Sequence, residues 1–290
     1  MAATTAVAAP RAPHPATTRE RGAVDPGAVR RFRRGVSVLD VDPDLGQWLD
    51  DGRRAAAARE LVGAPLALEM GEWDVASVMN AGPAHVGLLV VEGFLVRESL
   101  LRDGVSSELV GPGDLLRPWD DGDAFPRLLT VETRWNVLSP SRLVVLDSRF
   151  AARLRDYPEV MAALFARLHQ RSQRLTTAKA ISQLTNVERR LVALLWHLAE
   201  RWGVVTPDGV VIPLTLSHRL LSQMVGAQRP TISTAVARLA SRGEVIRRAD
   251  GTWLLPTQVA PDLTPRHQPV VHARRRLCRM DDSRSELALS

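Results

Sequence analysis

The chain has 290 residues, 45% of them hydrophobic, and a formal net charge of +6. That length is enough for two domains, each with its own core. The apolar runs are too short to cross a membrane, and the N-terminus lacks the pattern of a signal peptide. The single cysteine, Cys278, excludes an intrachain disulfide and an iron–sulfur cluster held by four thiolates of one chain. We therefore expect a protein of the reducing cytoplasm with no membrane partner.

Charge is divided unevenly between the two halves of the chain. Residues 35–150 carry a net charge of −9, whereas residues 171–256 carry +7. A concentration of positive charge favours a polyanionic partner such as DNA. The charge pattern therefore places a candidate nucleic-acid interface in the C-terminal half.

The N-terminal part of the chain predicts an arm followed by a short helical segment. Residues 1–34 are rich in Ala, Pro, Thr and Arg without periodicity, and we expect them to be disordered. Within them, the cluster Arg30–Arg34 is more typical of a solvated charge run than of a DNA contact. Residues 45–62 predict a helix that opens the N-terminal domain.

From Pro65 to Asp147 the pattern changes to short strands separated by glycine-containing turns. The candidate strands are 66–70, 73–79, 86–91, 94–98, 108–110, 128–135 and 142–146. Many short strands at this spacing predict a small antiparallel barrel or roll, which we assign to residues 35–148. Together with the helices that follow, they predict an α+β fold.

A long helix is predicted over residues 149–182. The apolar residues Met161, Leu164, Leu168 and Leu175 recur along it at spacings of 3, 4 and 7, interrupted by Arg171. A narrow apolar seam on a long helix favours pairing with the same helix of a second subunit, so these four residues are the predicted dimer interface. The alternative is that the seam packs on the chain's own barrel.

Residues 183–256 contain the most informative segment of the chain. A helix is predicted from Asn186, a candidate cap, and a strand over 210–214 leads into Leu216–Leu239. That segment predicts two short helices joined at Gly226, whose left-handed backbone ends the first of them. Ser217 can cap the first helix, and Pro230 suits the first turn of the second.

Residues 242–255 predict a two-stranded hairpin, which completes a winged helix-turn-helix. Such a motif places its second helix in the major groove of DNA. The predicted DNA-contacting residues are Gln228, Arg229, Thr231, Ser233 and Thr234 of that helix, with Arg247 and Arg248 of the wing. Arg238 is expected on the same outer side. The alternative, a helical hairpin with a solvated polar face, is disfavoured by the wing and the local charge. Residues 257–290 are expected to form a mobile basic tail.

The order roll, long helix and winged helix-turn-helix resembles the Crp/Fnr family of bacterial transcription regulators over residues 35–256. Leu89–Val96 and Leu109–Leu116 resemble the roll signature of the family, and Val225–Ser233 resembles its helix-turn-helix core. The resemblance implies a homodimer on a two-fold symmetric operator and a sensor domain of the cyclic-nucleotide-binding shape. It also implies that Arg229 reads a base, with a guanidinium suited to guanine O6 and N7.

The chain departs from the family pattern in both domains. The base-reading position that is often acidic in the family is Pro230 here, and Thr234 replaces a second arginine, so we expect a different operator. Where members that bind cyclic AMP carry Gly-Glu to hold the ribose, this chain has Arg117 and a proline. Arg127 remains as a candidate phosphate partner, followed by Leu128 instead of a hydroxyl residue. Arg117 and Arg127 are therefore candidate effector-binding residues, and cyclic AMP is not the expected effector.

No cofactor, metal site or catalytic centre is expected. Haem needs an axial ligand such as His85, and a lone histidine beside a Gly-Pro turn is more often a surface residue. The acidic segment Trp119–Asp123 is interpreted as a solvated loop and not as a cation site. No nucleophile motif, glycine-rich phosphate loop or metal-ligand spacing points to an enzyme.

Two functions are weighed. The sequence favours a DNA-binding transcription regulator whose partners are double-stranded DNA, a second subunit and, if it activates, RNA polymerase. The alternative is a small-molecule or nucleotide-binding sensor that acts through protein contacts. The division of charge argues against the alternative.

Overall fold

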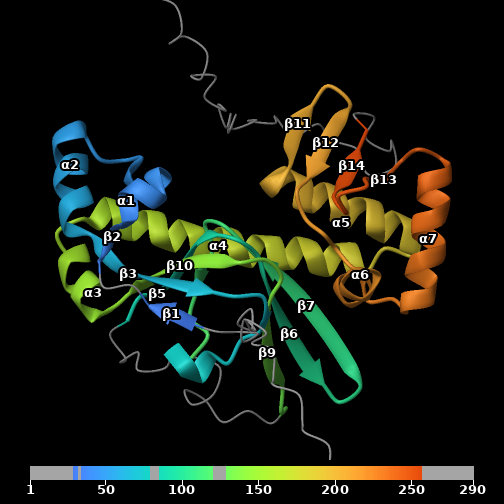
Figure 1. Ribbon diagram of the computed structural model, residues 1–290, viewed down its shortest axis with the longest axis horizontal. Coiled ribbons are helices and arrows are strands. Elements are labelled where there is room, and N and C mark those ends of the chain that lie inside the picture. Colours follow the sequence, from blue (N-terminus) through green and yellow to red (C-terminus); the bar gives the residue numbers. More distant parts are fainter. Residues whose placement is uncertain (1–28, 32–33, 79–84, 120–128, 257–290) are drawn as a thin grey trace, which may run out of the picture. The chain divides into compact units, whose positions relative to one another are not determined.

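The computed structural model describes residues 29–31, 34–78, 85–119 and 129–256 (Figure 1). The chain divides within a long helix into two compact units, one through Leu175 and the other from Thr176. Most of the N-terminal arm, the C-terminal tail with Cys278, and Arg127 lie outside the described residues. None of the described helices is long and apolar enough to span a lipid bilayer.

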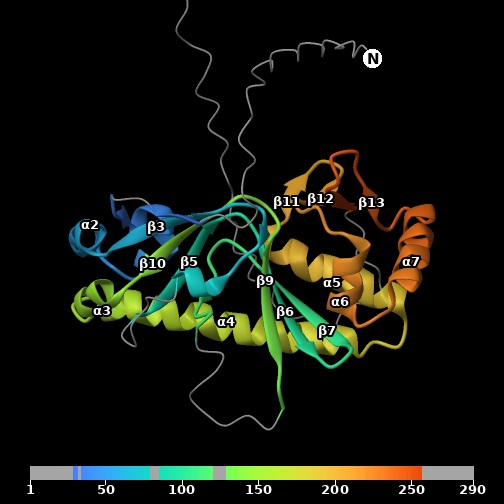
Figure 2. The same cartoon turned by 60° about the horizontal axis from the view of Figure 1, so that its bottom comes forward.

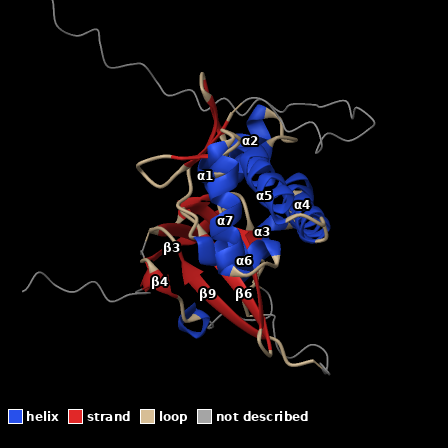
Figure 3. Ribbon diagram, turned by 90° about the vertical axis from the view of Figure 1, so that its right-hand side faces the viewer, coloured by secondary structure: helices blue, strands red, loops and turns tan. Residues whose placement is uncertain are grey.

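The first unit is built mainly from antiparallel strands. These are β1 (Val29–Arg31), β2 (Val36–Ser37), β3 (Val62–Leu68), β4 (Gly71–Glu72), β5 (Gly87–Glu92), β6 (Leu95–Leu101), β7 (Gly104–Val110), β8 (Leu115–Leu116), β9 (Glu132–Val137) and β10 (Ser141–Leu146). One sheet has the order β1-β3-β10-β5-β8, with β2 also paired to β3, and the other has the order β4-β9-β6-β7. Figure 3 shows β6 and β9 as neighbouring strands of the second sheet. The predicted antiparallel roll is confirmed.

Helices and short turns of helix complete the first unit. They are α1 (Val38–Val41), η1 (Pro43–Gly46), α2 (Asp51–Glu60), η2 (Val75–Val78), α3 (Ser148–Leu154) and α4 (Pro158–Ser182). Asp147 caps α3, because its carboxylate accepts hydrogen bonds from the N–H groups of Arg149 and Phe150 at 3.0 and 2.9 Å. This cap marks the change from strands to helices that the sequence predicts at Asp147.

The core of the first unit has two parts, one on each side of the first sheet. Leu88 and Val90 of β5 face the second sheet, where Trp135 packs edge-to-face on Trp73 at 5.8 Å between ring centroids. Leu89, between them in the sequence, faces the helices on the opposite side. Both faces of β5 are therefore buried, which explains its continuous run of apolar residues. In Figure 2 the first part of α4 lies along β5 and β10.

Two predicted elements of the first unit differ from the structure. The strand predicted over 73–79 is wrong, since residues 75–78 form the short helix η2. The Asp74 carboxylate accepts a hydrogen bond from the Ala76 N–H at 2.9 Å, a local bond that bends the chain. The helix predicted over 45–62 begins only at Asp51, because Asp50 caps it by accepting from the Arg53 N–H at 2.8 Å.

Three arginines of α4 bind carboxylates of the roll. The ion pairs are Arg167–Asp42, Arg171–Glu108 and Arg174–Asp114, with N–O distances of 2.9, 2.7 and 2.7 Å. Arg171 and Glu108 form two parallel hydrogen bonds, and each side chain is only 17% exposed. Arg171 thus interrupts the predicted apolar seam because its side chain pairs with Glu108 of the first unit.

The predicted seam separates into two neighbouring stripes on α4. Leu164 is 3% exposed in the core of its own unit, on the same stripe as Arg167 and Arg171, and the partly buried Met161 packs against that core from the neighbouring stripe. Leu168 and Leu175 lie on the next stripe and are 36% and 43% exposed. Packing on the chain's own roll therefore accounts for the first two seam residues, and the last two remain at the surface.

The second unit is a four-stranded sheet with three helices. Its elements are α5 (Val187–Trp202), β11 (Val204–Thr206), β12 (Gly209–Ile212), α6 (His218–Val225), α7 (Arg229–Ser241), β13 (Ile246–Arg247) and β14 (Trp253–Leu255), beside the end of α4. The strands are antiparallel in the order β11-β12-β14-β13. The α5 side chains Leu191 and Leu195 are buried, and α5 contacts both α6 and α7. The predicted Asn186 cap is present, because its side chain accepts from the Glu188 N–H at 2.7 Å.

Candidate nucleic-acid interface

Local capping fixes the turn between α6 and α7. The Ser217 hydroxyl oxygen accepts a hydrogen bond from the Leu220 N–H at 3.1 Å, and Gly226 ends α6 with a φ of +64°. The Ala227 N–H donates to the Ser222 carbonyl oxygen at 3.0 Å, which closes the last turn. The predicted cap and the predicted left-handed glycine are both confirmed.

The helix α7 has a buried face and an outer polar face. Ile232, Ala235 and Leu239 are buried at helical spacing, and Pro230 lies in the first turn as predicted. Each side chain predicted to contact DNA is exposed: Gln228, Arg229, Thr231, Ser233 and Thr234. This face presents donors and acceptors of the kind that bind base edges and phosphates.

His218 is a residue of this surface that sequence reasoning missed. It is the first residue of α6, and its Nδ1 lies 2.9 Å from the Ser233 Oγ on α7. Ser233 in turn donates to the Arg229 carbonyl oxygen at 3.3 Å. Partial burial, followed by the charges of Arg247 and Arg229, lowers the pKa of His218. The helix arginine and the wing arginine therefore act on the same histidine.

The wing is a short hairpin, as predicted. Arg247 and Arg248 are exposed, and the Arg248 N–H donates to the Thr252 carbonyl oxygen at 2.9 Å across the hairpin. The Asp250 carboxylate accepts from the Thr252 N–H at 2.9 Å, which tightens the turn. The guanidinium of Arg247 lies 5.8 Å from the ring centroid of buried Trp253. The wing is thus anchored through Trp253 while its arginines face outwards.

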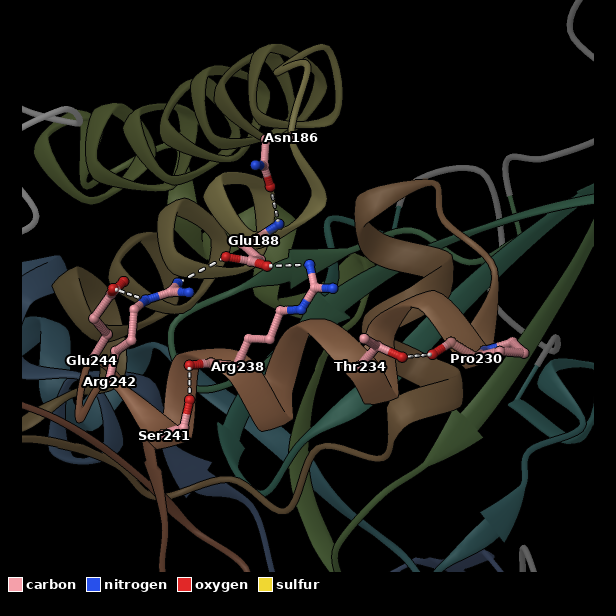
Figure 4. Close-up of polar contacts among 8 residues, drawn as sticks. All are labelled: Asn186, Glu188, Pro230, Thr234, Arg238, Ser241, Arg242 and Glu244. Carbon is pink, nitrogen blue, oxygen red and sulfur yellow. Dashed lines mark hydrogen bonds and ion pairs between the residues drawn. The ribbon is translucent and has the colours of Figure 1, made fainter.

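An ion-pair cluster joins α5 to the end of α7 (Figure 4). Glu188 Oε2 accepts from Arg242 at 2.8 Å, and Glu188 Oε1 lies 3.4 Å from Arg238. Glu244 accepts a further hydrogen bond from Arg242. The bond from Arg242, reinforced by Arg238, lowers the pKa of Glu188, so this carboxyl is ionised at neutral pH. Arg238, expected on the outer face, points its guanidinium towards α5.

In the first unit, Arg117 bonds to the backbone just before β5. Its Nη1 donates to the His85 carbonyl oxygen at 2.7 Å, and its guanidinium lies 5.9 Å from the ring centroid of Trp119. The nearby Asp114 is 2% exposed and accepts from the Gly111 N–H at 3.0 Å as well as from an arginine of α4. Arg127, the second candidate effector-binding residue, lies outside the described residues.

Known proteins resemble the second unit most specifically. The family model of the Crp-like helix-turn-helix domain matches residues 189–255. A protein of Mycobacterium tuberculosis described as a CRP-like cAMP-activated global transcriptional regulator is 29% identical over 180 residues, 61% of this chain and 73% of the relative. The global nitrogen regulator of a Synechocystis species is 31% identical over 88 residues, 30% of this chain and 38% of the relative.

A solved structure agrees with the fold. It is a cyclic nucleotide-binding domain containing protein from Listeria monocytogenes, with a TM-score of 0.53 and 18% sequence identity. The alignment covers 66% of this chain and 87% of that one. The likeness to this structure concerns the fold over the aligned part of the chain.

The roll, the long helix and the winged helix-turn-helix with its exposed polar helix define a DNA-binding transcription regulator. The match of the Crp-like helix-turn-helix domain and the CRP-like relative support a transcription regulator of the Crp/Fnr family.

Proposed function

We propose that the chain regulates transcription as a homodimer that binds a two-fold symmetric operator. The observation that carries the proposal is the exposed outer face of α7, beside a wing whose arginine acts on the same histidine as Arg229. Two such helices fit successive major grooves, about 34 Å apart along the duplex. The cytoplasm is the location that this function requires.

Some residues of this surface would contact DNA bases, and others would contact the phosphate backbone. Arg229, exposed at the start of the helix, is the candidate for bidentate recognition of a guanine. The remaining helix residues would share base and phosphate contacts: Gln228, Thr231, Ser233 and Thr234. Arg247 and Arg248 of the wing would bind the phosphate backbone, which fixes register but carries no sequence information.

The exposed stripe of α4 supports a second subunit. Phe165, Leu168 and Leu175 are 65%, 36% and 43% exposed on a helix whose neighbouring stripe is already packed on the roll. Apolar side chains in one stripe on a long helix favour a partner helix. Because Leu164 belongs to the core of its own unit, the proposed interface depends on Leu168 and Leu175, with Phe165 added.

The effector pocket is proposed to differ from that of cyclic AMP-binding members. The Mycobacterium tuberculosis relative is described as cAMP-activated, whereas Arg117 here is a donor at the place of a ribose-binding carboxylate. A guanidinium has only donors, so it cannot accept hydrogen bonds from ribose hydroxyls as a carboxylate does, and this one already donates to a backbone carbonyl. Titration calorimetry with cyclic AMP should show no binding in the micromolar range, and such binding would contradict this part of the proposal.

The experiment that tests DNA recognition is footprint sequencing of genomic fragments bound by the full-length protein. A shared two-fold symmetric sequence is expected among the fragments, and its position relative to promoters separates activation through RNA polymerase from repression. Recovery of fragments without a common sequence would contradict operator binding. Absence of any DNA binding would favour the alternative, a sensor that acts through protein contacts.

A further inference from the structure

We infer that Glu188 is a positioning residue that withholds Arg238 and Arg242 from the DNA backbone. The inference rests on the proposed function, because it concerns how tightly α7 binds DNA of any sequence. It assigns a role to a carboxylate outside the DNA-facing surface and to two arginines at the end of the recognition helix.

The first step is the position of the two arginines. Thr234, Arg238 and Arg242 follow one another at intervals of four residues, so their Cβ atoms lie on one stripe of α7. Arg238 is therefore one turn beyond Thr234, a proposed DNA contact, and its side chain is 67% exposed. A flexible arginine at this place is within one helical turn of the proposed interface.

The second step is the position of the carboxylate. Glu188 is 19% exposed and binds one arginine with each of its two oxygens, Arg238 at 3.4 Å and Arg242 at 2.8 Å (Figure 4). Both guanidinium groups are thereby turned towards α5. The 2.8 Å bond from Arg242 has the length of a strong charge-assisted hydrogen bond, whereas the 3.4 Å pair with the more exposed Arg238 is weaker.

The third step is the rigidity of the support. Glu188 lies in the first turn of α5, and its own N–H is capped by Asn186. Two residues further on, the Arg190 guanidinium donates to the carbonyl oxygens of Leu184 at 2.6 Å and Val225 at 3.2 Å. The start of α5 is thus tied to the end of α6, so the carboxylate is held in place beside the helix-turn-helix.

The consequence concerns the part of the binding affinity that does not depend on DNA sequence. Each arginine that reaches a phosphate strengthens binding to every sequence and steepens its salt dependence by about 0.9 in logarithmic slope. Phosphate contacts do not distinguish sequences. Withholding two arginines therefore lowers affinity for DNA of every sequence, random duplexes included, while leaving the base contacts near Arg229 unchanged.

The test compares Glu188→Gln with Glu244→Gln in the full-length protein. Both variants lose one negative charge near Arg242, but only the first also releases Arg238. Binding is measured against the tightest genomic fragment and a random duplex of equal length across a salt series. For Glu188→Gln, the slope should steepen by about one to two on both duplexes, and affinity at low salt should rise on both by a similar factor. Glu244→Gln should change both quantities much less.

Equal effects of the two variants, or weaker random binding in Glu188→Gln, would overturn the inference. The variant Arg238→Gln tests it independently of whether Glu188→Gln folds, which thermal unfolding checks. If Arg238 is withheld, its loss leaves the salt slope unchanged, whereas a slope shallower by about one would show that Arg238 already contacts phosphate. Failure of the unmodified protein to bind any duplex would instead overturn the proposed function and the inference with it.

Discussion

Arg229 is the first residue of α7, and its side chain is exposed while its carbonyl oxygen accepts from Ser233. Because it is proposed to read a base, Arg229→Ala should weaken operator binding by about 1–3 kcal/mol and relax sequence preference at one position of each half-site. Arg248→Ala, on the wing, serves as the comparison, since it should weaken binding to all sequences alike. Gel-shift titrations with base-substituted operators measure both effects. An equal loss on operator and random DNA for Arg229→Ala would contradict base reading.

We expect the titration of His218 to make DNA binding depend on pH. Ser233 donates to the Arg229 carbonyl oxygen, which assigns His218 Nδ1 as the donor to Ser233 and leaves Nε2 without a proton in the neutral ring. The pKa of His218 is lowered in the free protein by burial, Arg247 and Arg229. Phosphates of bound DNA favour the protonated ring, so its pKa should rise on binding. Affinity should then increase as pH falls from about 7.5 to about 6, by up to about tenfold per pH unit for one proton.

The matched variant for this pH dependence is His218→Asn, whose amide can still donate to Ser233 but does not titrate. It should bind DNA with a nearly flat pH profile over the same range. The pH dependence of folding runs in the opposite direction. Because the lowered pKa of His218 favours the neutral ring in the native state, its contribution to the free energy of unfolding is present above pH about 6.5 and is lost at lower pH. Affinity that decreases on acidification in both proteins would exclude His218 as the titrating group.

Residues that act within one turn of helix were predictable from the sequence, and residues that act across the fold were not. Ser217, Asn186 and Gly226 satisfy backbone groups a few positions away, so their types reveal their roles. Glu188 binds an arginine 54 positions further along the chain, and no local pattern marks that pairing. Ser233 was found as an exposed polar residue, whereas its neighbour His218 was missed because it belongs to another helix.

At the scale of the element, the turn between α6 and α7 depends on Gly226. A Cβ there would meet no atom within 4 Å, so the cost of Gly226→Ala comes from its positive φ alone. We expect a loss of about 1–2 kcal/mol in the free energy of unfolding, measured by urea titration. Gly243, with a φ of +69° and the same open surroundings, provides a control that should lose as much. If Gly226→Ala had no effect on stability, the turn would not require a left-handed residue.

The helix α4 shows how a tertiary contact overrides a periodic pattern. Arg171 interrupts the apolar seam, yet it forms two hydrogen bonds with Glu108 on β7, 63 positions away. Arg171→Leu should restore the seam and still destabilise the first unit by about 1.5–3 kcal/mol, because it leaves a mostly buried carboxylate without its partner. Arg142→Leu, at a pair with both side chains more than 60% exposed, should cost less than about 1 kcal/mol. Chemical unfolding of both variants tests the difference, which would vanish if the Arg171 pair were solvated.

Across the whole chain, the order of the elements and the fold class were predictable because the apolar residues of each region recur with a period of their own. Strands with turns, a long helical pattern and a helix-turn-helix follow one another in the sequence as they do in the structure. Boundaries failed where side chains compete with the backbone, as at Asp74, whose local hydrogen bond replaces a strand by η2. The division of the α4 seam could not be predicted, because helical spacing alone does not say which stripe meets the roll.

The proposed homodimer would allow two helix-turn-helix units to bind the two halves of a symmetric operator together. A charged residue at Leu175 should disfavour pairing of two α4 helices, because a carboxylate would then be buried against apolar side chains. Leu175→Glu should therefore sediment as a monomer and keep its affinity for a half-site, while full-operator binding weakens by about 100-fold or more, as expected when linked half-sites no longer act together. Val205→Glu is the control, since Val205 on β11 is 83% exposed and lies away from α4 in the sequence. A Leu175→Glu protein that remains dimeric would place the subunit interface elsewhere, because an apolar stripe that tolerates a carboxylate is not buried.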